Sequence, residues 1–170
     1  MTRKMSQPPR WSNIHPVTRG GLWLTLAIAL VAGFEGFASK PYVDRVGTGQ
    51  PETWCYGATK ADGPPPPYSK VFTKAQCQTL LGASLLKYDA QVHSCVKVSL
   101  PPHREAALVS FAYNLGSRAL CRGAVARHIN AGDIAGGCRA MLSYNHARGR
   151  ILPGLTRRRQ AEYKLCLRND

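Results

Sequence analysis

The first hydrophobic segment of the chain is an uncharged run over residues 20–34, and Glu35 follows it directly. The run is shorter than the ~20 residues that a helix needs to cross a bilayer, and glycine and alanine dilute its hydrophobicity. Residues 1–19 contain basic but no acidic side chains. A basic tail before a short apolar run is typical of an export signal. We therefore predict a flexible basic tail over residues 1–19 and a signal-like or anchor-like helix over residues 20–34.

Cap signals predict that the later part of the chain is mostly helical. Thr73 and Gln76 form a capping-box pair, which opens a helix that we expect to continue through Gln91. Residues 101–102 are a proline pair that opens a second helix, and Gly116 ends it. Shorter helices are predicted over residues 123–130, over residues 133–143 with Asp133 as N-cap, and over residues 156–167 with Thr156 as N-cap.

The segment between Glu35 and the first of these helices is predicted to be extended. Pro41 disfavours a helical conformation at the residue before it. A hairpin is expected to follow, with a strand over residues 54–59. Residues 61–69 contain four consecutive prolines and are predicted to be an exposed connection.

Composition is consistent with one folded domain. The chain has 170 residues, of which 44% are hydrophobic, and this is enough to bury a proper core. The formal charge of +14, from 23 basic and 9 acidic residues, implies a polyanionic partner. Nucleic acid and acidic polymers of the bacterial envelope are the two alternatives. The basic residues are scattered along the chain, whereas a nucleic-acid reader concentrates them on one face.

The cysteines indicate an oxidising compartment. There are six of them, an even number, and none forms the C-x-x-C spacing of zinc or redox sites. We therefore predict disulfides. Six cysteines allow fifteen connectivities, and their spacing does not choose among them.

Two carboxylates with different surroundings are the candidates for acid–base chemistry. Glu35 follows an apolar run, and an apolar setting raises the pKa of a carboxyl and suits a general acid. Asp44 lies in a polar, turn-like segment where a carboxylate stays ionised. We expect the two groups to face each other across a cleft, since the first ends a helix and the second lies on the extended segment.

These residues give the chain a resemblance to the phage-type lysozymes, or endolysins. The family pattern is a glutamate after an apolar helix, then an aspartate, then a threonine that opens a Thr-x-Cys-Tyr/His-Gly strand. Glu35, Asp44 and Thr53 occupy these places. The resemblance covers roughly residues 24–168 and continues through residues 72–77 (FTKAQC), 110–116 (SFAYNLG), 130–133 (NAGD) and 154–162 (GLTRRRQAE).

The resemblance implies a lysozyme-like α+β fold, mostly helical, over residues 24–170, with a small N-terminal lobe that carries a β-hairpin and a larger helical C-terminal lobe. It implies an endolysin that hydrolyses the glycosidic bonds of bacterial peptidoglycan by an inverting mechanism. Glu35 would be the acid, and Asp44 with Thr53 would hold and activate the water. The substrate-binding residues would be Tyr42, Tyr56 and Asn114. The disulfides would pair Cys55 with Cys77, Cys95 with Cys121, and Cys138 with Cys166.

Two points of the pattern stay open. The threonine follows the aspartate more closely in many family members, and residues 48–52 lengthen the turn here, so Thr48 is a rival for the role of Thr53. The arginine run at residues 157–159 is either a solvated helix face or, as the family pattern suggests, a support of the cleft through buried pairing with Glu162.

Other chemistries have little support in the sequence. It contains no G-x-S-x-G elbow, no P-loop and no H-x-x-x-H pair, so we predict neither a metal nor a cofactor. The alternative to an enzyme is a basic, disulfide-stapled protein that binds envelope polymer or nucleic acid without catalysis. A pure binder of polyanions gains nothing from a carboxylate pair in its cleft.

The apolar run also suggests a route to the substrate. We expect a monomer that binds no nucleic acid and is tethered transiently to the host inner membrane before it acts in the periplasm, as in the signal-arrest-release endolysins that the chain resembles. Cleavage within residues 27–29 would remove most of the helix before Glu35, so we expect the run to be retained. The alternative is an enzyme that stays in the host cytoplasm until a separate pore releases it.

Overall fold

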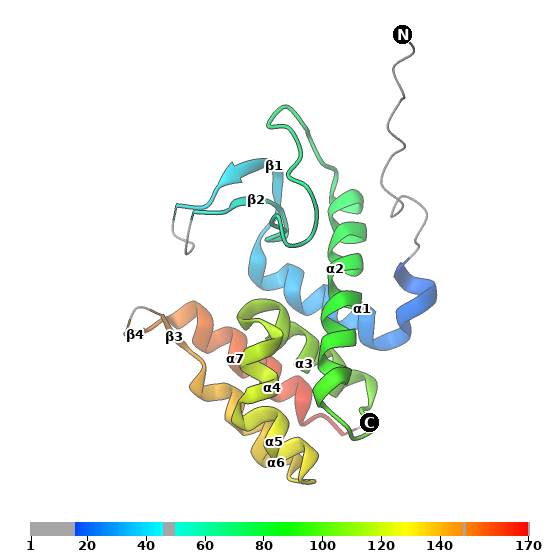
Figure 1. Ribbon diagram of the computed structural model, residues 1–170, viewed down its shortest axis with the longest axis vertical. Helices are drawn as coiled ribbons and strands as arrows, with labels where there is room; N and C mark the ends of the chain where they lie inside the picture. Colours follow the sequence, from blue (N-terminus) through cyan, green and yellow to red (C-terminus); the bar gives the residue numbers. More distant parts are fainter. Residues whose placement is uncertain (1–15, 46–49, 148, 170) are drawn as a thin grey trace.

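The computed structural model describes residues 16–45, 50–147 and 149–169, with side chains from residue 21 onward. Helix α1 spans Pro16–Glu35, with a kink at Gly21, where φ is 55° (Figure 1). It therefore begins earlier than the predicted residue 20, since proline is well suited to the first helical position. The part of the predicted tail before Pro16 lies outside the described residues. Within the described parts of the chain, none of the helices has the length and hydrophobicity needed to cross a bilayer.

A two-stranded antiparallel hairpin follows α1. Strand β1 spans Ala38–Val43 and strand β2 spans Glu52–Cys55. Tyr42 lies opposite Thr53, and a register shift separates this pair from the pairing of Ala38 with Cys55. The strand predicted over residues 54–59 is thus wrong in its bounds, because the chain turns at Cys55 (φ 56°) and Gly57 (φ 82°).

Helix α2, Lys74–Cys95, connects the hairpin lobe with the helical lobe (Figure 1). Its predicted capping box is present: Gln76 N donates to Thr73 Oγ1 at 3.2 Å, and Thr73 N donates to Gln76 Oε1 at 2.9 Å. The helix continues beyond the predicted Gln91. Helix α3, Pro102–Leu115, ends at Gly116 as predicted. It is buried all around from Ala106 to Ala112, and α1, α2, α4 and α7 pack against it, so α3 forms the centre of the core.

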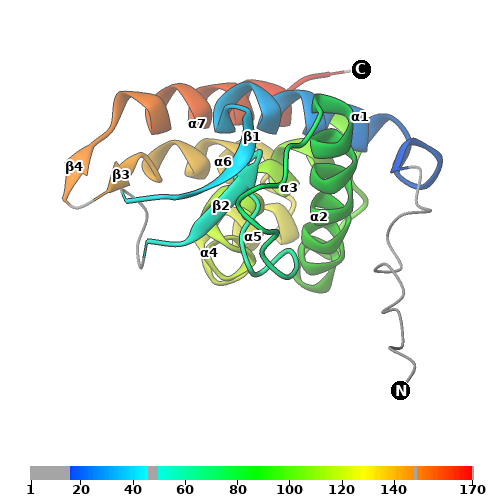
Figure 2. The ribbon, with the colours of Figure 1, turned by 90° about the horizontal axis from the view of Figure 1, so that it is seen from above.

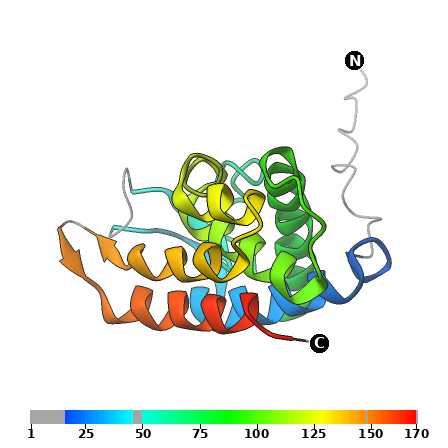
Figure 3. The ribbon, with the colours of Figure 1, turned by 90° about the horizontal axis from the view of Figure 1, so that it is seen from below.

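The remaining elements complete the helical lobe. They are α4 (Ser117–Arg122), α5 (Ala124–Asn130), α6 (Ile134–Ala140), η2 (Met141–Ser143), β3 (His146–Ala147), β4 (Arg150–Ile151) and α7 (Pro153–Cys166). α1 and α7 lie along the same side of the molecule (Figure 2 and Figure 3). The sequence did not predict α4 or the β3–β4 hairpin. Thr156 is not the N-cap of α7: the helix begins at Pro153, and Thr156 Oγ1 donates to Leu152 O at 3.1 Å.

Three disulfides join different parts of this architecture. Cys55–Cys77 ties β2 to α2, Cys95–Cys121 ties the end of α2 to α4, and Cys138–Cys166 ties α6 to α7. This is the pairing that the resemblance to phage lysozymes implied. The two-lobed, mostly helical α+β fold that was expected is the fold of the chain.

Candidate active site

Glu35 is the last residue of α1, and its carboxyl group is held from two sides. Arg158 Nη1, from α7, donates a hydrogen bond to Glu35 Oε1. On the other side, a Cβ atom at Gly57 would lie 3.0 Å from Glu35 Oε2, so the turn after β2 approaches the carboxyl closely. The sequence prediction of an apolar setting holds along the chain, but in space an arginine contacts Glu35. Only tertiary packing brings this arginine there.

The turn beside Glu35 is fixed by a hydrogen bond to the core. Tyr113 Oη, from α3, donates to Tyr56 O at 2.8 Å. Burial is the main cause that raises the pKa of Tyr113, and the carboxylates Asp62 and Glu35 add to it. The phenol therefore stays protonated and can donate this bond throughout the physiological range. The ring of Tyr56 is itself buried and packs on Phe37 at 5.8 Å between centroids.

Asp44 and Thr53 lie on the hairpin. Asp44 directly follows β1, and its backbone N donates to Pro51 O at 2.9 Å. Thr53 Oγ1 donates to the same carbonyl oxygen at 3.2 Å. Thr53 is only 5% exposed, so little of its side chain is accessible to solvent. The rival Thr48 lies outside the described residues.

Tyr42 is the third candidate site residue on the hairpin, and it lies on β1. It is 45% exposed and pairs with Thr53 across the hairpin. Burial of its ring raises its pKa, and the charges of Asp44 and Glu35 raise it further. The charges of both candidate carboxylates therefore act on the same phenol.

A buried network of charges lies behind Glu35. Arg158, Arg159 and Glu162 are all nearly inaccessible to solvent, which decides between the two interpretations of the arginine run in favour of buried pairing. Glu162 Oε1 accepts from Ser110 Oγ at 2.8 Å and from Arg158 Nε at 3.2 Å. Glu162 Oε2 lies 2.7 Å from Arg159 Nε. Arg158 thus bridges Glu162 and Glu35, and the network restricts the position of the Glu35 carboxyl.

Asn114 is held by the same network. Arg159 Nη2 donates to Asn114 Oδ1 at 3.0 Å, so the amide oxygen of Asn114 is bound to the arginine. Asn114 and Glu35 line one cleft, between the end of α1 and the start of α7. Its lining residues are Gly33, Phe34, Glu35, Asn114, Leu152, Pro153, Gly154, Leu155, Arg157 and Arg158. Asp44, Thr53, Tyr42 and Tyr56 do not line this cleft.

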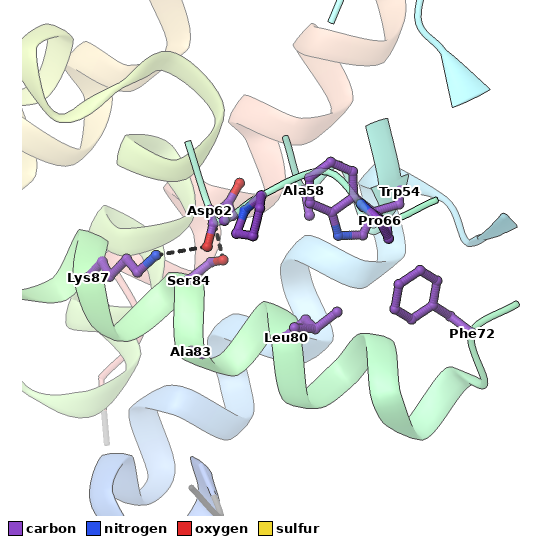
Figure 4. Close-up of a pocket in the computed structure, with 11 residues that line it drawn as sticks. Trp54, Ala58, Asp62, Pro66, Phe72, Leu80, Ala83, Ser84 and Lys87 are labelled. Atoms are coloured by element: carbon purple, nitrogen blue, oxygen red, sulfur yellow. Dashed lines mark hydrogen bonds between the residues drawn. The ribbon is translucent and has the colours of Figure 1, made fainter. Parts of the chain in front are cut away.

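The proline-rich connection packs against α2 around a separate apolar pocket (Figure 4). Asp62 lies between Ser84 and Lys87 in this pocket: Ser84 Oγ donates to Asp62 Oδ1 at 2.6 Å, and Lys87 Nζ donates to Asp62 O at 3.1 Å. Trp54, next to Thr53 on β2, forms part of the apolar wall. The connection therefore helps to hold the hairpin that carries Thr53.

Comparison with known proteins identifies the family. The phage lysozyme family model matches residues 32–162. The chain is 38% identical to the SAR-endolysin of Bacteriophage PS119, over 79% of this chain and 77% of that protein. It is 32% identical to the SAR-endolysin of Enterobacteria phage P21, over 94% of this chain and 97% of that protein.

A solved structure shows the same fold. The endolysin from Escherichia coli O157:H7 phage FAHEc1 superposes with a TM-score of 0.74, at 29% identity, over 84% of this chain and 90% of that one. The chain therefore belongs to the phage lysozyme family, and its activity is that of a lysozyme, a glycoside hydrolase of bacterial peptidoglycan.

Proposed function

We propose that the chain cleaves peptidoglycan by an inverting mechanism in which Glu35 is the general acid. The observation that carries the proposal is the position of Glu35, at the end of α1 in a cleft and in contact with buried Arg158. The proton of the Glu35 carboxyl passes to the glycosidic oxygen as the bond from that oxygen to the anomeric carbon breaks. Because the network behind Arg158 is buried, the carboxyl does not need to be oriented anew in each turnover.

The attacking water would be held by Asp44 and Thr53 on the opposite side of the sugar. Its oxygen forms the new bond to the anomeric carbon, and Asp44 accepts its proton. An inverting enzyme needs its two carboxyl groups about 6.5–9.5 Å apart, which leaves room for that water. The placement of Glu35 on a helix end and of Asp44 on a hairpin supports this arrangement, since the two groups come from different elements.

We propose that Tyr42 and Asn114 contact the substrate directly. Tyr42 is exposed at the hairpin, and Asn114 lines the cleft beside Glu35. The side chain of Tyr56 is buried, so we propose that it acts through its backbone, by positioning the turn at Gly57.

Replacing Glu35 with glutamine tests the acid. The amide keeps the shape of the side chain but has no acidic proton to give, so clearing of purified peptidoglycan should fall by roughly 10²–10⁴-fold. Glu52→Gln is the matched control, because Glu52 lies on the hairpin and its carboxylate accepts a hydrogen bond from Tyr68 on the surface. Near wild-type clearing by folded Glu35→Gln protein would show that the acid is another residue.

Substitutions on the hairpin test the water-binding pair. Asp44→Asn should be nearly as severe as Glu35→Gln, because the amide cannot accept the proton of the water. Thr53→Ala should reduce kcat more than Thr48→Ala does, measured in the same clearing assay. The reverse order would place the role of the threonine in the lengthened turn.

We propose further that the enzyme reaches its substrate by signal arrest and release, without a separate pore. The relatives in phages PS119 and P21 are named SAR-endolysins. In the folded chain the apolar run is part of α1 and packs into the core through Leu24, Ala27 and Val31. The run would be inserted in the inner membrane first and would pack beside Glu35 after release. The rival is an enzyme that waits in the cytoplasm, with the run as a core helix only.

The substitution Leu22→Arg separates the two routes. Leu22 is 62% exposed, so the folded enzyme should tolerate the arginine and keep its activity when purified. A charge within the run opposes insertion into a membrane. When expressed without a pore partner, the wild-type chain should therefore appear in the membrane fraction and the periplasm, and Leu22→Arg should not. If neither protein appears there, and blocking the secretion machinery does not delay lysis, the pore route applies.

We also propose that the enzyme acts as a monomer and binds no nucleic acid. Size-exclusion chromatography with light scattering checks the first statement, and an electrophoretic shift assay at physiological salt checks the second.

A further inference from the structure

Three potential metal ligands meet where α2 packs against α3, at the end of α2 far from the hairpin (Figure 1). Asp89 and His93 lie one turn apart on α2, so both side chains are on the same face of the helix. Glu105, in the first turn of α3, joins them. Their ligand atoms all lie within 4.8 Å of one another. Neither the proposed function nor the cleft at Glu35 involves this group.

The spacing of these atoms fits a small divalent cation. His93 Nε2 lies 3.0 Å from Glu105 Oε1 and 3.4 Å from Asp89 Oδ1. Zinc binds histidine nitrogen and carboxylate oxygen at about 2.0–2.2 Å, so two ligand atoms of a tetrahedral site are about 3.3–3.6 Å apart. The two distances are thus near the edge length of a zinc tetrahedron before any side chain moves.

The charges also favour a cation. Two carboxyl groups converge here on one imidazole. Asp89 Oδ1 is shielded from solvent and makes no hydrogen bond of its own. A divalent ion would satisfy the enclosed oxygen and remove the repulsion between the carboxylates.

We propose that Asp89, His93 and Glu105 form a Zn²⁺ site in which water completes the coordination. The ion would cross-link the last turns of α2 to the first turn of α3. It would stabilise the helical lobe and take no part in the cleavage of the glycosidic bond. The three ligands are partly open to solvent, with exposed side-chain fractions of 19%, 46% and 14% for Asp89, His93 and Glu105, so an ion can enter without unfolding.

The test is calorimetric titration of the full-length, oxidised, EDTA-treated protein with ZnCl₂ at pH 7.5, with thermal unfolding measured in parallel. One Zn²⁺ should bind per chain, and Tm should rise with Zn²⁺ concentration, as required when an ion binds the folded state alone. The disulfides leave none of the cysteines as a thiol, so zinc binding by the unfolded chain is limited. MgCl₂ should have little effect, because Mg²⁺ prefers oxygen ligands and an octahedral site.

Two histidine variants decide whether this cluster binds the ion. His93→Gln should abolish the one-to-one binding and the rise in Tm, and since His93 is half exposed, the fold should survive. His128→Gln is the matched control. His128 Nδ1 lies 2.8 Å from the carboxylate of Asp133, so this pair offers one histidine and one carboxylate, whereas the proposed site offers one histidine and two carboxylates. This variant should bind Zn²⁺ as the wild type does. The proposal is overturned if the wild type shows neither heat nor a shift in Tm, or if His93→Gln binds as well as the wild type.

Discussion

At the residue scale, the site depends on how closely the backbone approaches one carboxyl group. Gly57 has a φ of 82°, a conformation that side chains with a Cβ rarely adopt, and it borders Glu35. Arg158 contacts the same carboxyl from the opposite side. Glu35 is therefore confined to the space between a glycine and an arginine, and a change at either neighbour should act on activity before it acts on the fold.

The substitution Gly57→Ala should remove most of the activity for this reason. Its methyl group would lie 3.0 Å from Glu35 Oε2 and would displace the carboxyl or the turn. Gly132→Ala is the control, since Gly132 has a φ of 84° and nothing within 4 Å of the added Cβ. Both variants should lose about 1–2 kcal/mol of the free energy of unfolding through the same backbone strain, and urea unfolding measures this loss. Only Gly57→Ala should lose kcat; equal activity losses would mean that backbone strain alone explains the effect.

At the element scale, the sequence predicts the helices whose ends carry capping or terminating residues. α2 and α3 were predicted from a capping box, a proline pair and a glycine, all of which are local signals. α4 was not predicted, because it is short and has no side-chain N-cap. Thr156 was misassigned because a threonine that donates to a carbonyl one turn earlier has the same sequence signature as an N-cap.

The site divides in the same way between local and tertiary signals. Glu35, Asp44 and Thr53 lie in a recognisable linear order, so the sequence could nominate them. The contact of Glu35 with Arg158 joins α1 to α7, and the group of Asp89, His93 and Glu105 joins α2 to α3. The spacing along the chain places Asp89 and His93 on one face of α2, but it encodes neither the approach of Glu105 nor the contact of Glu35 with Arg158. The sequence contains no H-x-x-x-H pair, and one histidine joined by carboxylates from two helices has no comparable linear motif.

The capping box of α2 gives a prediction at this scale. Thr73→Ala removes the oxygen that accepts from Gln76 N, and it should lower the free energy of unfolding by about 1 kcal/mol. Thr79→Ala is the control, since Thr79 Oγ1 only donates to Ala75 O within the same helix. This control should stay within about 0.5 kcal/mol of the wild type in urea unfolding. Equal losses would mean that the cap contributes nothing beyond an ordinary helix position.

At the scale of the whole molecule, the disulfides stabilise different parts of the architecture. Cys138–Cys166 lies within the helical lobe, whereas Cys55–Cys77 fixes the hairpin lobe to α2. Their sequence separations, 28 and 22, are similar. Loop entropy therefore assigns them nearly equal stabilisation, about 3.5 kcal/mol each. What distinguishes them is the part of the site that each one positions.

Removing the two disulfides separately should therefore separate stability from activity. The double variants Cys55→Ser/Cys77→Ser and Cys138→Ser/Cys166→Ser should lose similar free energy of unfolding, about 2–5 kcal/mol, by urea unfolding. At a temperature where both are folded, the first should lose more kcat, because Thr53 and the turn at Gly57 flank Cys55. The second should remain close to the wild type, since it leaves the hairpin attached to α2. If both variants keep full activity while folded, the contacts of Asp62 with Ser84 and Lys87 are enough to hold the hairpin in place without the covalent link.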